Sequence, residues 1–441
     1  MFDLHTLSAR VAESAEPGLA TRPFGTRALL LDEDVQPALA ACLAELGARE
    51  PLVITDATPK TRAGEPLLAG WMARLPAASR LLELPAEVHA TQDEARALAA
   101  RLDGAKVLIS LGSGAVTDLA KSARDLAVPD SLLISLPTAA SVTAYTSALT
   151  VLLVDGVKRT LPARAPDYVF VDLTTLAEAP PVMTRAGFGD VLARSVSYGD
   201  WWLANQFGLD EGFSVVPGVV MGQAEQAMID AATDVAAGRP AGVRAVAEGV
   251  LRAGLAMSVV NQTAPLSGWE HVISHWLDMT AAGWGRRPAL HGEQVGVATL
   301  VAARAYEQDW PRLDRAALAG PLDPAVRSDW QAAIDAAFAT LPGGQAMAAE
   351  AWRDVSRKLD AWQAAQPVRQ AFVARLDDAQ AELNALIRPS REVEAALLAA
   401  GAPTRFDQMS QPVTTEAAHQ AITHAHLGRA RLTLGDLLAI G

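Results

Sequence analysis

The feature that most constrains the fold is the alternation of short apolar runs with helix-forming segments over residues 25–175. The runs lack the polar–apolar alternation of a half-exposed strand, so they predict strands buried on both faces. They are Arg27–Leu31, Pro51–Thr55, Val107–Leu111, Leu132–Leu136 and Tyr168–Asp172. Segments rich in Ala, Leu and Glu, such as Val35–Leu46 and Asp93–Leu102, lie between several of them and predict helices. This order predicts a largely parallel sheet with helices on both faces.

The chain changes character after Pro180 and Pro181. Long Ala-rich amphipathic stretches follow and predict helices. They include Thr184–Asn205, Val243–Val260, Val295–Tyr306 and Gln370–Ile387. With 441 residues the chain is long enough for two cores. We therefore expect an α/β domain over residues 1–178 and an all-helical domain over residues 179–441.

Composition excludes several classes of function. Its 37 Lys and Arg residues against 50 Asp and Glu residues give a net charge of −13, which argues against a nucleic-acid or anionic membrane surface as partner. Cys42 is the only cysteine, so neither an intrachain disulfide nor a thiolate zinc site is expected. The first residues do not have the pattern of a secretory signal, and no stretch approaches the roughly 20 apolar residues of a membrane helix. The expected compartment is the cytoplasm.

A glycine turn follows one of the predicted strands. Val107–Leu111 runs into Gly112-Ser113-Gly114, and a helical segment comes next. Such a turn lets backbone N–H groups approach a pyrophosphate at a helix N-terminus. The third glycine of GxGxxG is absent, since Thr117 stands there, so a plain strand-to-helix connection is the competing interpretation.

Two further strand ends carry residues compatible with a nucleotide. Leu132–Leu136 ends in the small residues 137–141, at the carboxyl end of a parallel strand, where ligands bind in open α/β sheets. Asp56 follows Pro51–Thr55 and has the chemistry to accept from a ribose hydroxyl, although a turn aspartate is an equal alternative. Asp56 favours NAD, whereas nearby Lys60 and Arg62 offer charge to the 2′-phosphate of NADP.

The second half contains a group of histidines. His271 and His275 are four residues apart and share one face of a predicted helix, and His291 follows 16 residues later. Together with Asp190 they would form a set that suits a divalent first-row ion and leaves positions for a substrate oxygen. Such an ion acts as a Lewis acid on an alcohol or carbonyl oxygen. Histidines satisfied within a helical core are the alternative, and spacing alone does not place Asp190 near His271.

Three more histidines, His419, His424 and His426, are interspersed with Thr, Gln and Ala near the C-terminus. We interpret them as part of a solvated helix rather than as a site.

Six motifs in order resemble the iron-containing alcohol dehydrogenase and dehydroquinate synthase-like superfamily, and within it the sn-glycerol-1-phosphate dehydrogenases. They are Gly-Ser-Gly-Ala-Val-Thr-Asp-Leu-Ala-Lys at 112–121, Pro-Thr-Ala-Ala-Ser at 137–141, Gly-Val-Lys-Arg-Thr at 156–160, Ala-Gly-Phe-Gly-Asp at 186–190, Glu-His-Val-Ile-Ser-His at 270–275 and His-Gly-Glu-Gln-Val at 291–295. The tail over residues 428–438 also looks related. The likeness spans about residues 50–300.

This resemblance implies a Rossmann-like N-terminal domain and a helical C-terminal domain. It implies that Asp190, His271 and His291 hold one divalent metal ion (zinc, nickel or iron), and that His275 faces the substrate as a catalytic residue or stands behind it. It also implies NAD or NADP as cofactor, and makes a homo-oligomer the expected assembly. The implied cofactor contacts are Asp56, Gly112, Gly114, Ala115, Val116, Thr117, Asp118, Thr138, Ala139, Ala140, Ser141 and Ser147.

One departure concerns the substrate. Where glycerol-1-phosphate dehydrogenases usually have Ser-Asn-Asp-Gly, this chain has Ser-Val-Thr-Ala, so Thr143 replaces a carboxylate that contacts substrate. Thr143 keeps a place among the predicted catalytic residues, with weaker hydrogen bonds.

We expect a metal-dependent, NAD(P)-linked oxidoreductase acting on a small phosphorylated or polyhydroxylated ketone or aldehyde and its alcohol. A sugar-phosphate cyclase of the dehydroquinate synthase type and a non-catalytic binding protein are the alternatives.

Overall fold

The computed structural model describes residues 2–16, 21–210 and 212–441. By internal packing the chain divides into two compact units. Unit 1 comprises residues 1–154, 158–191 and 215–262, and unit 2 comprises residues 155–157, 192–214 and 263–441. The predicted division at residue 178 into a cofactor domain and a metal domain stays a prediction. The packing units differ from it because residues 215–262 return to unit 1.

A parallel six-stranded sheet forms the centre of unit 1, in the order β1-β10-β7-β6-β2-β5. Its strands are β1 (Ala28–Asp32), β2 (Leu52–Asp56), β5 (Arg80–Leu84), β6 (Val107–Gly112), β7 (Leu132–Pro137) and β10 (Tyr168–Asp172). Short pairs are formed by β3 (Thr61–Arg62) with β4 (Glu65–Pro66) and by β8 (Leu149–Val154) with β9 (Val157–Pro162). Five of the sheet strands confirm the five predicted runs to within one residue at each end.

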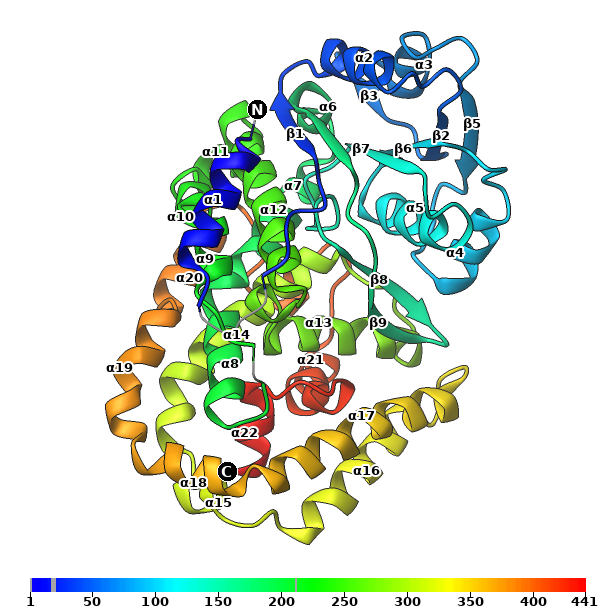
Figure 1. Ribbon diagram of the computed structural model, residues 1–441. Helices are drawn as coiled ribbons and strands as arrows, with labels where there is room; N and C mark the ends of the chain where they lie inside the picture. Colours follow the sequence, from blue (N-terminus) through cyan, green and yellow to red (C-terminus); the bar gives the residue numbers. More distant parts are fainter. Residues whose placement is uncertain (1, 17–20, 211) are drawn as a thin grey trace. The chain divides into compact units, whose positions relative to one another are not determined.

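Helices cover both faces of this sheet, as Figure 1 shows for α2 and α3 on one side and α4 and α5 on the other. Alternate residues of the strands, such as Ile54 and Val53, enter the two separate apolar cores beneath these helix pairs. The helices of unit 1 are α1 (Leu4–Ser14), α2 (Gln36–Glu45), α3 (Leu67–Met72), α4 (Gln92–Ala99), α5 (Gly114–Ala127), α6 (Leu173–Ala177), α7 (Pro181–Leu192), α9 (Val216–Met221), α10 (Ala224–Asp230), α11 (Ala232–Ala236) and α12 (Pro240–Val260). Burial on both faces explains why the strands have apolar runs.

Within its described residues, unit 2 is built from helices apart from the short segment 155–157. Its α-helices are α8 (Arg194–Gln206), α13 (Trp269–Thr280), α14 (His291–Gln308), α15 (Arg315–Ala319), α16 (Pro324–Phe338), α17 (Gly344–Ala364), α18 (Gln366–Ala374), α19 (Leu376–Leu386), α20 (Ser390–Ala399), α21 (Thr415–His424) and α22 (Leu434–Ile440). Five 3-10 turns join them: η1 (Ala264–Leu266), η2 (Ala281–Trp284), η3 (Trp310–Arg312), η4 (Phe406–Gln408) and η5 (Ala425–Gly428). The predicted α/β fold with a parallel sheet followed by helices is thus confirmed.

Three details differ from the predictions. The stretch Thr184–Asn205 forms two helices, α7 and α8, and Gln370–Ile387 is interrupted at Arg375, whose φ of −110° and ψ of 14° leave the helical region. His426 is buried against Trp330, with ring centroids 4.6 Å apart, so its predicted solvation is wrong. None of the described helices is both long and apolar enough to cross a membrane.

Candidate functional site

The glycine turn between β6 and α5 is closely packed. A Cβ atom on Gly112 would lie 2.6 Å from the side chain of Val116, and one on Gly114 would overlap the side chain of Val142. Both glycines are therefore required by packing, and the turn also presents the first N–H groups of α5 at the carboxyl end of β6. The predicted contacts Ala115, Val116 and Thr117 lie in this first turn.

The segment after β7 is held against α5 by a buried lysine. Lys121 is fully buried, forms an ion pair with Asp118 at 2.8 Å, and donates to the carbonyl oxygens of Ala144 at 3.0 Å and Leu149 at 2.6 Å. Asp118, a predicted cofactor contact, thus also anchors this segment through Lys121. Ser147, another predicted contact, is buried, and its Oγ accepts from the backbone N–H of Leu149 at 3.1 Å.

Helix α12 holds the same segment from a second direction. Thr146 donates its hydroxyl to the carbonyl of Leu251 at 2.7 Å, and Ser258 accepts from the N–H of Ala148 at 2.8 Å. A Cβ atom on Gly254 would lie 2.6 Å from the carbonyl oxygen of Thr143. The backbone around Thr143 is fixed in this way, and the side chain of Thr143 is half-buried.

Helix α7 packs directly on the small residues that follow β7. A Cβ atom on Gly187 would overlap the carbonyl oxygen of Ala140, so the helix backbone itself touches the segment containing Thr138, Ala139, Ala140 and Ser141. Asp190 is one turn further along α7 and is buried. Burial, together with the negative charges of Asp118 and Asp190, raises the pKa of the fully buried Tyr145. Unit 1 therefore brings Asp190 close to the predicted cofactor segment.

Asp56 lies at the end of β2 and is buried. It accepts from the N–H of Thr58 at 2.9 Å and forms an ion pair with Lys60 at 2.9 Å. Arg62 instead binds both carboxylate oxygens of Asp172, each at 3.0 Å. The guanidinium of Arg62 is therefore paired with Asp172, and Lys60 is the cation that lies beside Asp56.

Unit 2 brings His271, His275 and His291 together. The first two lie one turn apart on α13, and His291 is the first residue of α14. The ring centroid of His291 is 5.1 Å from that of His271 and 5.6 Å from that of His275. His271 and His275 are buried, and His291 is half-buried.

Hydrogen bonds fix which ring nitrogen of His271 and of His291 carries the proton. Nδ1 of His271 lies 3.0 Å from a carboxylate oxygen of Glu270, which can only accept, so the proton is on Nδ1. Ser274 donates its one hydroxyl hydrogen to Oε1 of Gln294 at 2.8 Å and therefore accepts from Nδ1 of His291 at 2.9 Å. In the neutral form both rings consequently carry a lone pair on Nε2, as a metal ligand must.

The orientation of Gln294 is itself determined. Its amide nitrogen donates to a carboxylate oxygen of Asp278 at 2.9 Å, which turns its carbonyl oxygen toward Ser274. The chain Asp278–Gln294–Ser274 thus orients His291 in the way that supporting groups orient metal-binding histidines.

A buried carboxylate supports the N-terminus of α13. Asp200 on α8 accepts from the N–H of Trp269, from the Tyr306 hydroxyl at 2.8 Å and from the N–H of Leu434 at 2.7 Å. Burial, together with the charge of Glu270, raises the pKa of Asp200 to about 7.

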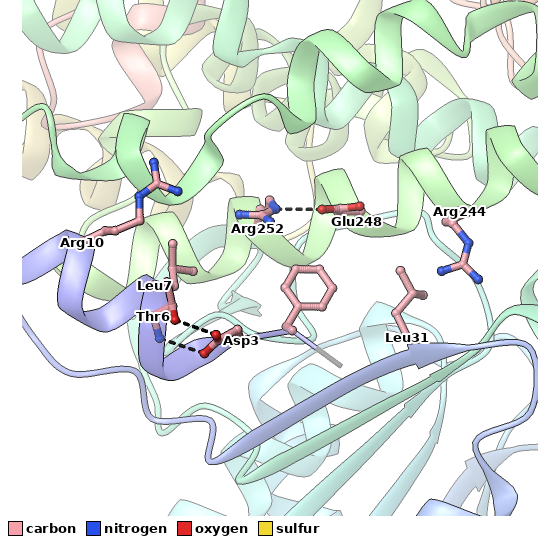
Figure 2. Close-up of a pocket in the computed structure, with 9 residues that line it drawn as sticks. Asp3, Thr6, Leu7, Arg10, Leu31, Arg244, Glu248 and Arg252 are labelled. Carbon is pink, nitrogen blue, oxygen red and sulfur yellow. Dashed lines mark hydrogen bonds and ion pairs between the residues drawn. The ribbon is translucent and has the colours of Figure 1, made fainter.

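A separate cavity of about 350 Å³ lies in unit 1 between α1, β1 and α12 (Figure 2). Its lining includes Arg10, Arg244 and Arg252, and the last is paired with Glu248 at 3.0 Å. None of the predicted site residues lines this cavity.

The sequence did not reveal the residues that orient the histidines. Ser274 and Gln294 lie inside the quoted motifs, but their hydrogen bonds depend on how α13 and α14 pack. Glu270 is the neighbour of His271 and was available as a signal, because a carboxylate beside a histidine is a common supporting pair.

Comparisons with known proteins agree with this arrangement. Residues 30–180 match the family model described as iron-containing alcohol dehydrogenase. The chain is 30% identical to a glycerol-1-phosphate dehydrogenase [NAD(P)+] of Bacillus velezensis over 342 residues, which cover 76% of this chain and 84% of the relative. It is 36% identical to the corresponding protein of Geobacillus stearothermophilus over 214 residues, 48% of this chain and 52% of the relative. The latter match thus spans about half the length of the relative.

Solved structures show the same fold at low identity. The sulfoacetaldehyde reductase of Bifidobacterium kashiwanohense superposes with a TM-score of 0.59 over 96% of this chain and 97% of its own, at 14% identity. An iron-containing alcohol dehydrogenase of Thermococcus thioreducens superposes with a TM-score of 0.58 over 94% and 97%, also at 14% identity.

Proposed function

The chain belongs to the iron-containing alcohol dehydrogenase family, and from this membership we propose a metal-dependent, NAD(P)-linked oxidoreductase. Its reaction interconverts a small phosphorylated or polyhydroxylated ketone or aldehyde and the corresponding alcohol. Dihydroxyacetone phosphate and glycerol 1-phosphate are the proposed pair, by similarity to the relatives named above. The observation that carries the proposal is the hydrogen-bonding of His271 and His291, which prepares two imidazole Nε2 atoms as ligands.

We propose that Asp190 completes the ligand set with His271 and His291. One carboxylate and two imidazoles match the preferences of zinc, nickel and iron, and leave coordination positions for a substrate oxygen. Asp190 lies two residues before Leu192, where the chain enters unit 2, so chain connectivity favours its role as the third ligand.

When bound, the nicotinamide supplies the hydride, and the divalent ion polarises the substrate carbonyl. His275 would donate a hydrogen bond from Nε2 to the carbonyl oxygen and stabilise the negative charge that develops there, and a water molecule would supply the proton that completes the alcohol. In the oxidative direction water would take up the alcohol proton, while His275 would hold the alcohol oxygen through the same Nε2 hydrogen bond. Reduction thus consumes one hydride and one proton and produces one alcohol and one oxidised nicotinamide.

The proposed cofactor surface is the carboxyl edge of the parallel sheet in unit 1. The first turn of α5 would bind the pyrophosphate, the segment 138–141 and Ser147 would line the nicotinamide half, and Asp56 would accept from the adenosine ribose. Thr143 would offer a hydroxyl to the substrate.

A homo-oligomer in the cytoplasm is the proposed setting. The single cysteine, which precludes an intrachain disulfide, is compatible with a reducing compartment.

The test is a screen of NADH and NADPH oxidation by zinc-, nickel- and iron-loaded protein. Dihydroxyacetone phosphate, dihydroxyacetone and short aldehydes serve as substrates. The proposal predicts turnover of at least one ketone or aldehyde with loss of NAD(P)H absorbance. Release of inorganic phosphate from a sugar phosphate without net NADH consumption would contradict it.

A further inference from the structure

We propose that Arg429 is a positioning residue that holds His275 in the tautomer protonated on Nε2 and so sets it apart from the two ligand histidines. The consequence for catalysis rests on the proposed function. The tautomer itself rests only on contacts within unit 2.

One hydrogen bond determines which ring nitrogen of His275 carries the proton. A guanidinium nitrogen of Arg429 lies 2.6 Å from Nδ1 of His275. A guanidinium is permanently protonated and can only donate, so Nδ1 must accept. A neutral imidazole carries a single N–H, which is therefore on Nε2 of His275.

The three histidines are sorted by the partner at Nδ1. The carboxylate of Glu270 places the proton of His271 on Nδ1, and the hydroxyl of Ser274 does the same for His291. The cationic guanidinium of Arg429 places the proton of His275 on Nε2 instead. Spacing in the sequence does not distinguish His271 from His275, because both lie on one face of α13. Because of these different partners, Nε2 of His271 carries the lone pair of a metal ligand, whereas Nε2 of His275 carries the proton of a hydrogen-bond donor.

Arg429 is held in place from both sides along the chain. The buried Lys358 donates to the carbonyl of His426 at 2.6 Å and pairs with Asp436 at 2.6 Å, so one side chain ties both ends of the segment 426–436. Within that segment Arg431 donates to the carbonyl of Ser267, immediately before α13. The segment thus presents Arg429 to α13 with little freedom.

The experiment is a long-range proton–nitrogen NMR spectrum of zinc-loaded protein labelled with ¹⁵N-histidine, in the absence of substrate. His275→Gln identifies the resonances of His275. We expect an unprotonated Nδ1 and a protonated Nε2 on His275 in the wild type. The control Arg405→Met, which removes an arginine that pairs with Asp407, should show the same pattern. Arg429→Met should give the averaged shifts of exchanging tautomers, and Arg429→Lys, which retains a cationic donor, should restore the wild-type pattern. A protonated Nδ1 in the wild type, or an unchanged tautomer in Arg429→Met, would overturn the proposal.

Steady-state kinetics separate positioning from substrate binding. Arg429→Met should lower kcat on the best carbonyl substrate by about tenfold to a hundredfold, with KM within about twofold and the zinc content unchanged. A raised KM with an unchanged kcat would overturn the proposal, because Arg429 would then bind the substrate. If the protein shows the expected tautomer but turns over no carbonyl compound, the tautomer of His275 is supported. Only the proposed function is then contradicted.

Discussion

At the scale of single residues, the chemistry depends on which histidines bind metal. His271→Ala should abolish stoichiometric zinc binding, because it removes a lone pair that Glu270 has oriented. His275→Gln should retain one zinc per chain and lower kcat by about 10²- to 10³-fold, as expected for loss of a hydrogen-bond donor to the developing oxyanion. Metal analysis of both variants after dialysis checks this, and loss of zinc from His275→Gln would make His275 a third imidazole ligand.

We propose that a pair of side chains also decides the choice between NAD and NADP. Asp56 forms an ion pair with Lys60. Its carboxylate would repel the 2′-phosphate of NADP, and the pairing would keep the Lys60 ammonium from binding that phosphate. Asp56→Ser should therefore raise the ratio of kcat/KM for NADPH to that for NADH by about tenfold, equivalent to about 1.4 kcal/mol. Asp32→Ser, at the exposed end of edge strand β1, is the control. Equal ratios in the wild type and Asp56→Ser would remove Asp56 from the cofactor surface.

The buried carboxylate of Asp200 links folding stability to pH. Its pKa is about 7 in the folded protein against an ordinary value of 3.8, so the folded state retains a proton that the unfolded state releases. Its contribution to the free energy of unfolding should fall as pH rises from about 4 to 7, by at most about 4 kcal/mol, and then level off. Asp200→Asn should lose this dependence.

Urea unfolding of the wild type and Asp200→Asn at pH 5 and pH 8 measures the effect. A wild type that loses no more stability than the variant between these pH values would show that Asp200 is ionised in the folded protein at both.

At the scale of elements, the contact of α7 with the segment after β7 connects the proposed metal ligand to the proposed cofactor surface. Gly187→Ala would force a methyl group against the carbonyl of Ala140 and should cost about 1–3 kcal/mol of unfolding free energy. It should also weaken NAD(P)H binding, because α7 must move. Gly70→Ala in α3, where a Cβ meets open space, should be neutral or stabilising by up to about 1 kcal/mol.

Urea unfolding and fluorescence titration with NADH check the two glycine variants. Equal unfolding free energies and equal NADH affinities for Gly187→Ala and the wild type would contradict the close contact.

Elements buried on both faces were predictable from the sequence, because burial demands apolar runs. Strand β5 was not, since as an edge strand its residues alternate in burial and Glu83 interrupts the run. The break between α7 and α8 also escaped prediction, because apolar residues continue through Ala193 and the backbone angles of Ala193 (φ −51°, ψ −30°) are themselves helical.

For the whole molecule, the ordered motifs predicted the family and the fold, and they indicated the three histidines. They could not predict that Ser274, Gln294 and Arg429 orient those rings, because these contacts join segments up to 154 residues apart. The cavity lined by Arg10 and Arg244 had no signal in the sequence either.

The most direct test of the central claim is metal removal and restoration on one preparation. Metal content and NAD(P)H oxidation with dihydroxyacetone phosphate are measured before chelation, after chelation and after titration with zinc, nickel or iron. We expect the activity to disappear with the metal and to return in proportion to metal occupancy, reaching its plateau at about one ion per chain. Activity that survives complete removal of the metal would contradict it.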